Sequence, residues 1–155
     1  IPAIYIHCLT ATPNDTIGVE RTGMTRSVNR RKWDLSELEY LIAHPETETG
    51  SVFPRFVELL ELRRRQPAFH PDAAQRILAL GEALFAFERS AVDGGQRILV
   101  LANLTAETVT VPLLDLPEDL SHRDELLSLN RAVFENGTIE VEPYAVFWFS
   151  AYHFG

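Results

Sequence analysis

The spacing of apolar residues changes near residue 66, and this change constrains the fold more than any other feature. Between residues 34 and 65 the apolar residues recur at intervals of three and four, which predicts helices. Residues 66–71 carry two prolines and break this pattern. Beyond them apolar and polar residues alternate in short runs, which predicts strands. We therefore expect two parts, residues 1–70 and an all-β domain at residues 71–155.

The second part has the pattern of an antiparallel β-sandwich. Short alternating runs predict strands at residues 76–80, 84–88, 97–104, 108–111, 138–142 and 145–149. Asn136-Gly137 precedes the fifth of these runs, and this dipeptide predicts a type I′ hairpin turn.

The first part opens on an apolar run at residues 1–6, which has the composition of a parallel strand buried on both faces. Such a strand needs parallel neighbours, so we expect the chain to begin inside a larger domain. Residues 10–31 are polar and show no sustained period, which predicts a long loop of the kind that often carries function. Asp34, with Glu37 three residues later, predicts the start of a helix that ends before Pro45. A second helix is expected from about Ser51.

Charge and cysteine content narrow the classes of function. The formal net charge of −8 argues against nucleic-acid binding, which requires a basic surface. A single cysteine, Cys8, excludes an intrachain disulfide and favours a reducing, cytoplasmic compartment. No apolar run has the length of a membrane span. No group of histidine, cysteine and carboxylate residues has the spacing of metal ligands, so we expect no metal site.

Several motifs resemble those of one enzyme group. Asn14-Asp15, residues 20–22 and residues 26–30 are similar to the loop after the last barrel strand in sucrose phosphorylases and their relatives. These relatives include glucosylglycerate and glucosylglycerol phosphorylases, within the α-amylase superfamily (glycoside hydrolase family 13). The resemblance implies the C-terminal end of a (β/α)8 TIM barrel, with its last strand, active-site loop and closing helices, followed by the β-sandwich domain. One departure is Thr25, where some sucrose phosphorylases have glycine.

The same resemblance implies an activity. Such enzymes are retaining glucoside phosphorylases, which transfer an α-glucosyl group between phosphate and a small acceptor such as fructose, glycerate or glycerol. A carboxylate attacks the glucosyl carbon while a second carboxyl group protonates the leaving oxygen. In this family those groups lie on earlier barrel strands, so we expect no catalytic residue in this chain. The expected partners are the N-terminal part of the barrel, a glucoside and inorganic phosphate as co-substrate, with no further cofactor.

Two residues are candidate substrate-binding groups by their match to the family loop. Arg26 is expected to hold a glucosyl hydroxyl and to pair with an aspartate from an earlier loop, because its planar fork fixes two acceptors. Asp15 is expected on the acceptor side. The alternatives are a solvated arginine and a turn aspartate. Arg30 and Arg31 are expected to be structural or solvated.

Two other functions remain open. The parent enzyme is alternatively a hydrolase or transglucosidase of the same superfamily. The chain is alternatively a stand-alone carbohydrate-binding β-module, which would need exposed aromatic platforms. Trp148 lies in an apolar run and Trp33 at a helix start, so the sequence gives this second alternative little support.

Overall fold

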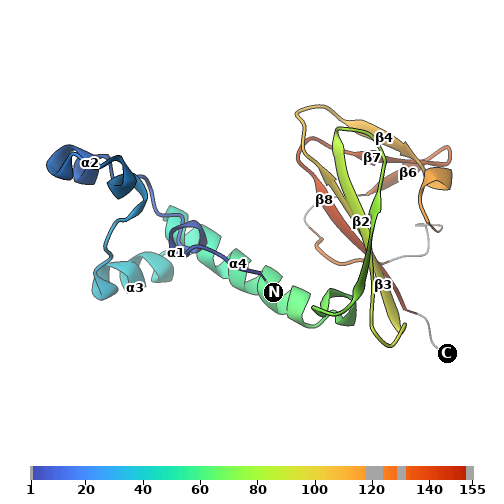
Figure 1. The fold of residues 1–155 in the computed structure, drawn as a ribbon, viewed down its shortest axis with the longest axis horizontal. Helices are drawn as coiled ribbons and strands as arrows, with labels where there is room; N and C mark the ends of the chain where they lie inside the picture. Colours follow the sequence, from blue (N-terminus) through green and yellow to red (C-terminus); the bar gives the residue numbers. More distant parts are fainter. Residues whose placement is uncertain (1, 118–123, 129–131, 153–155) are drawn as a thin grey trace. The chain divides into compact units, whose positions relative to one another are not determined.

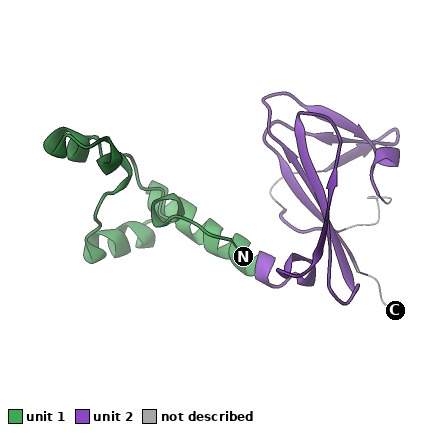
Figure 2. Cartoon of the chain, in the orientation of Figure 1, with its two compact units in different colours: residues 1–62 green, residues 63–155 purple. Residues whose placement is uncertain are grey.

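The chain divides into two compact units. The computed structural model describes residues 2–117, 124–128 and 132–152 (Figure 1). The units comprise residues 1–62 and 63–155 (Figure 2). Residues 63–70, which the sequence pattern placed with the first part, therefore lie in the second unit.

The first unit is helical in the part that the structure describes. Its elements are α1 (Ile6–Leu9), α2 (Thr16–Thr22), the 3-10 helix η1 (Thr25–Asn29), α3 (Leu35–Ala43) and α4 (Glu48–Arg64), which crosses into the second unit. The stretch at residues 10–31 is thus not a structureless loop, because α2 and η1 lie within it.

The strand expected at residues 1–6 is not formed by the residues that the structure describes. Residues 2–5 have no regular structure, α1 begins at Ile6, and Ile1 lies outside the described residues. A strand needs a neighbouring strand to pair its backbone groups, and the described residues of this unit contain none. The side chains of Ile4 and Tyr5 consequently stay exposed.

The start of α3 is fixed by a side-chain cap. A carboxylate oxygen of Asp34 accepts hydrogen bonds from the backbone N–H groups of Ser36 (2.9 Å) and Glu37 (3.2 Å). These contacts pair N–H groups that have no partner inside the helix. Asp34 therefore begins the helix as predicted, whereas the Glu37 carboxylate pairs with Arg31 at 2.7 Å.

Helix α4 begins before the expected Ser51 because of a second cap. The hydroxyl of Thr47 accepts a hydrogen bond from Gly50 N at 2.9 Å. Gly50 is buried, and a Cβ at this position would lie 2.0 Å from the backbone oxygen of His44. Only glycine therefore fits the close approach of these two segments.

The second unit is an antiparallel β-sandwich, as the alternation predicted. Its strands are β1 (Ala74–Leu78), β2 (Leu84–Ser90), β3 (Gln96–Asn103), β4 (Val109–Pro112), β5 (Asp124–Glu125), β6 (Val133–Glu135), β7 (Thr138–Val141) and β8 (Val146–Tyr152), with 3-10 helices η2 (Pro67–Phe69) and η3 (Leu113–Asp115). One sheet has the order β1-β2-β3-β8-β5 and the other β4-β7-β6. The two-residue strand β5 is too short to show alternation in the sequence.

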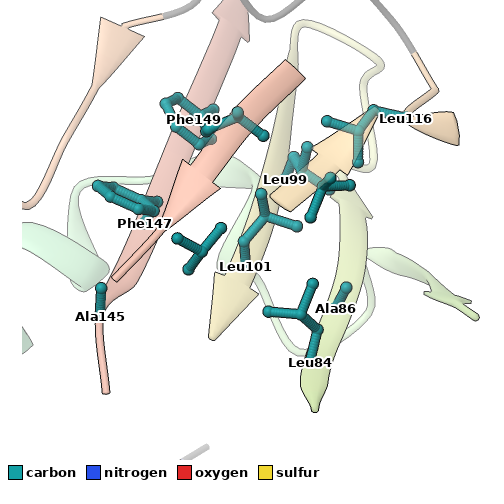
Figure 3. Close-up of a cluster of buried hydrophobic side chains, with 11 residues drawn as sticks. Leu84, Ala86, Leu99, Leu101, Leu116, Ala145, Phe147 and Phe149 are labelled. Atoms are coloured by element: carbon teal, nitrogen blue, oxygen red, sulfur yellow. The ribbon is translucent and has the colours of Figure 1, made fainter. Parts of the chain in front are cut away.

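The main core lies between the two sheets (Figure 3). Strand register places Leu101 opposite Phe147 and Leu99 opposite Phe149, so that these side chains share one face. Both phenylalanines are at most 1% exposed, and their ring centroids lie 5.5 Å apart. Val141 from the smaller sheet closes the core from the other side.

The hairpin between β6 and β7 has the predicted turn. Asn136 has a φ of 50° and Gly137 a φ of 75°, and the flanking residues Glu135 and Thr138 pair with one another. Positive φ at both central residues is the requirement of a type I′ turn.

A buried glutamine ties η2 to the larger sheet. Gln96 is 1% exposed. Its side-chain oxygen accepts from Ala68 N (3.0 Å), and its amide nitrogen donates to Gln66 Oε1 (2.7 Å) and Ser150 Oγ (3.0 Å). Phe69 packs beside this network in a second apolar cluster. These hydrogen bonds join the segment before β1 to the larger sheet and give its buried polar groups partners. The segment is therefore part of the β-sandwich.

A buried carboxylate lies between two arginines of the same sheet. Glu88 is 3% exposed and pairs with Arg76 (2.7 Å) and with Arg97. Burial alone would raise the pKa of Glu88, but the hydrogen bond from Arg76 and the charge of Arg97 outweigh burial and hold the pKa below its ordinary value. The carboxylate is therefore ionised in the folded chain at neutral pH.

Candidate functional site

Residues 13–28 form a compact excursion, and hydrogen bonds join the two segments that flank it, residues 5–12 and 29–33. The Tyr5 hydroxyl donates to Asn29 O at 2.6 Å, and His7 Nε2 lies 2.9 Å from Arg31 O. Further along, Trp33 Nε1 donates to the Thr12 hydroxyl at 2.9 Å. Flanking segments held together in this way are typical of Ω-loops, and Ω-loops frequently carry function.

Asp15 starts α2 within this excursion. Its Oδ1 atom accepts a hydrogen bond from Gly18 N at 2.7 Å. Gly18 is buried, and a Cβ at this position would lie 2.2 Å from Asp15 Oδ2. Glycine at 18 thus makes room for the carboxylate at 15. The structure assigns Asp15 this capping contact, and its expected contact with an acceptor stays a prediction.

A tight turn joins α2 to η1. Gly23 ends α2 in the left-handed region with a φ of 65°. The Thr22 hydroxyl donates to Gly18 O at 2.7 Å and lies 2.9 Å from the Ser27 hydroxyl. These contacts hold η1 against α2, so that the side chains of both elements border the same hollow.

The hollow has a volume of about 710 Å³ and lies entirely within the first unit. It is lined by Pro13, Asn14, Asp15, Thr16, Ile17, Gly18, Arg21, Thr22, Ser27, Arg30, Arg31 and Lys32. Its charged lining consists of four basic side chains and the single carboxylate of Asp15. Small-molecule sites commonly occupy roughly 300–1,000 Å³, so the size suits a small ligand.

The structure does not bring Arg26 and Asp15 together at this hollow. Arg26 is exposed and is not among the lining residues. Its described contact is from Nη2 to Met24 Sδ at 3.7 Å. The expected role of Arg26 in holding a glucosyl hydroxyl therefore stays a prediction, and the guanidinium is accessible for it.

Sequence reasoning did not anticipate that Arg21 and Lys32 line the site. Arg30 and Arg31 were expected to be structural or solvated, yet both border the hollow as well. Arg31 does have a structural role, because it pairs with Glu37 and lies over the Trp33 ring at 4.0 Å. The available signal was the basic run at residues 30–32, but folding of the excursion is needed to bring residue 21 beside it.

The described residues contain neither a group of metal ligands nor a membrane-spanning helix. Among residues 2–117, 124–128 and 132–152, no three histidine, cysteine or carboxylate side chains are grouped closely enough to hold a metal ion. Within the same ranges, no helix has the length and apolar character needed to cross a lipid bilayer.

Comparison with known domains and structures supports the fold. The family model of the C-terminal immunoglobulin-like domain of D-apionate lactonase matches residues 89–149. The crystal structure of the α-glucosyl transfer enzyme XgtA superposes with a TM-score of 0.55 at 17% identity, covering 77% of this chain and 21% of that one. At this level of identity the likeness concerns the fold alone.

Curated relatives point to one group of enzymes. The glucosylglycerate phosphorylase of Spirochaeta thermophila is 31% identical over 162 aligned residues, which cover 98% of this chain and 27% of the relative. That of Allomeiothermus silvanus is 42% identical over 84 residues, or 54% of this chain and 15% of the relative. The aligned part of the chain thus spans little more than a quarter of the first relative and about one seventh of the second (27% and 15%). With the motifs at residues 14–30 and the β-sandwich, these similarities show that the chain belongs to the sucrose phosphorylase-like subfamily of the α-amylase superfamily, corresponding to a C-terminal portion of its members.

Proposed function

We propose that the protein carrying this chain is a retaining glucoside phosphorylase that transfers an α-glucosyl group between phosphate and a small acceptor. The observation that carries this proposal is the similarity over 98% of the chain to an enzyme named glucosylglycerate phosphorylase. Because a second relative has the same name, glycerate is the first acceptor to test.

The reaction we propose is a double displacement. An enzyme carboxylate displaces the acceptor from the glucosyl carbon, and phosphate then displaces the carboxylate, so that the product keeps the α configuration. We assign neither carboxyl group to this chain. Its contribution would be to position substrates from the excursion at residues 13–28, since loops at the carboxyl ends of barrel strands build such sites.

Arg26 is our candidate for holding the glucosyl group. The guanidinium is exposed, and no described carboxylate pairs with it, so its donors are available for a sugar hydroxyl or for an aspartate elsewhere in the enzyme. Asp15 is our candidate on the acceptor side. Its Oδ1 atom caps α2, Oδ2 accepts no hydrogen bond from a described residue, and Asp15 lines the hollow.

The proposal includes the setting of the enzyme. The rest of the barrel is the required partner, and inorganic phosphate is the co-substrate without a further cofactor. A cytoplasmic location is part of the proposal, because the one cysteine, Cys8, is an exposed free thiol of the kind that reducing compartments maintain.

The test is product analysis with the full-length enzyme. Glucosylglycerate incubated with enzyme and phosphate should yield α-glucose 1-phosphate, with the anomer identified by NMR. The reverse reaction from α-glucose 1-phosphate and glycerate should yield the glucoside. The matched control omits phosphate, and the yield of free glucose should then stay low.

Two results would contradict the proposal. Release of free glucose at the same rate with and without phosphate would favour a hydrolase of the same superfamily. Saturable binding of glucans by the 155-residue chain alone, measured by calorimetry, would favour a carbohydrate-binding module. The second result is not expected, because the Trp148 ring packs on Phe69 with a centroid distance of 4.7 Å and the Trp33 ring is covered by Arg31.

A further inference from the structure

The hollow beside α2 has a charge opposite to that of the chain. The whole chain has a formal net charge of −8. The hollow is lined by Arg21, Arg30, Arg31 and Lys32 and by one carboxylate, that of Asp15. A local excess of positive charge in a concave surface concentrates anions from solution. The rest of the chain, being acidic, does not favour a large polyanion such as nucleic acid.

Most of these cations are free to bind a ligand. No described residue forms an ion pair or hydrogen bond with the side chain of Arg21, Arg30 or Lys32. The remaining cation, Arg31, is held between Glu37 and the Trp33 ring. One basic side chain is therefore fixed in place by the fold, whereas the others retain all their donors.

The neutral part of the lining also suits an oxyanion. Thr16 and Ser27, which carry hydroxyl groups, border the hollow. The Thr16 hydroxyl makes no hydrogen bond to a described residue. Guanidinium, ammonium and hydroxyl donors together match the acceptor oxygens of a phosphate or carboxylate, and charge-assisted hydrogen bonds are roughly twice as strong as neutral ones.

We infer that this basic hollow binds the oxyanion group of a small substrate, through Arg21, Arg30 and Lys32. The group is the phosphate or the carboxylate of an acidic acceptor such as glycerate, which share this chemistry. This inference rests on the proposed function, because that function supplies the two candidate anions. It goes further by assigning the anion to residues other than Arg26 and Asp15.

The experiment uses the full-length enzyme and changes charge with little change in size. The variants are R21Q and the double variant R30Q/K32Q. The matched control is R64Q, because Arg64 is exposed, has no described partner and lies outside the hollow. The measurements are KM for phosphate in phosphorolysis, KM for glycerate in synthesis, and the thermal transition of each variant.

We expect the double variant to raise at least one of the two KM values by about tenfold or more, as removal of charge-assisted contacts does. R64Q should leave both KM values and the thermal transition unchanged. A rise for phosphate alone would identify phosphate as the ligand, and a rise for glycerate alone would identify the acceptor carboxylate. R30K should retain part of the affinity, which a purely structural role of the side chain does not predict.

Unchanged KM values for both anions in R21Q and R30Q/K32Q, in an enzyme that still performs phosphorolysis, would overturn the inference and leave the proposed function intact. If the unmodified enzyme shows no phosphorolysis, the proposed function fails instead. Calorimetric titration of the full-length protein with inorganic phosphate and with glycerate then decides the inference. Binding that is lost in R30Q/K32Q would support it, and absence of binding would refute it.

Discussion

The contact between Asp15 and Gly18 predicts that the effect of one substitution changes sign with the residue at the other position. In the native chain, G18A places a Cβ 2.2 Å from Asp15 Oδ2, and the three nearest atoms to that Cβ all belong to Asp15. The carboxylate must therefore leave its capping position. Replacing Asp15 by alanine as well removes all three of these atoms.

The magnitudes follow from the two local effects. Loss of a helix cap costs about 1 kcal/mol. Replacing glycine by alanine inside a helix gains up to about 1 kcal/mol. With the added steric strain, G18A alone should destabilise α2 by about 1 kcal/mol, whereas G18A in the D15A background should stabilise it by about 0.5–1 kcal/mol. The coupling energy between the two positions is then about 1.5–2 kcal/mol, well above the error of a double-mutant cycle.

Amide hydrogen exchange of residues 16–22 is the appropriate assay, because α2 is a short element that opens locally. The four proteins of the cycle are the native chain, D15A, G18A and D15A/G18A. The double variant should exchange more slowly than D15A, by about threefold for 0.7 kcal/mol. Additive effects, with G18A equally harmful in both backgrounds, would refute the argument that Asp15 is what Gly18 accommodates.

Three further outcomes can be measured. In the full-length enzyme, R26K should lower kcat/KM by at least about tenfold, because lysine keeps the charge and loses the planar fork. The thermal transition should stay nearly unchanged. R64K is the control, and a nearly normal kcat/KM for R26K would remove Arg26 from the site. Because the pKa of Glu88 is lowered, its ion pairs stabilise the fold at pH values above the ordinary pKa of 4.5, and this stability is lost as the pH falls through the folded pKa. Urea unfolding at pH 7 and pH 3 should show this loss, and E88Q should reduce the pH dependence. Q96L should cost about 2–4 kcal/mol because it removes the described partner of the buried Ala68 N–H and Ser150 hydroxyl groups, against about 0.5 kcal/mol for Q75L on an exposed part of β1. Equal urea midpoints for these two variants would contradict the assigned network.

The β-sandwich was predictable because each signal in it is local. In β7, alternation marks Ile139 and Val141 as the side chains that face the core, and strand pairing preserves that alternation. Asn136-Gly137 alone determines the hairpin, since few residue pairs adopt positive φ twice in succession. By contrast, the contact of Gln96 with Ala68 joins residues far apart in sequence, and no local pattern indicates it.

The first unit was harder to predict because its elements depend on contacts rather than on periodicity. Helix α2 has no apolar stripe, and Asp15 and Gly23 define its ends through backbone geometry. The apolar run at residues 1–6 is typical of a buried strand, but a strand forms only where another strand pairs with it. The basic lining of the hollow depends on the folding of the whole excursion, which brings residue 21 beside residues 30–32.

The glutamine network determines where the β-sandwich can be separated from the helices. A piece cut to begin at residue 71 would discard Gln66, Ala68 and Phe69, which would strip Gln96 of two of its partners and uncover the apolar surface of Ile98. A piece beginning at residue 63 would retain all of them. Fusing this β-sandwich to another catalytic domain would therefore require residues 63–70 as well. These residues pack as part of the β-sandwich and do not serve only as a connection to the helices.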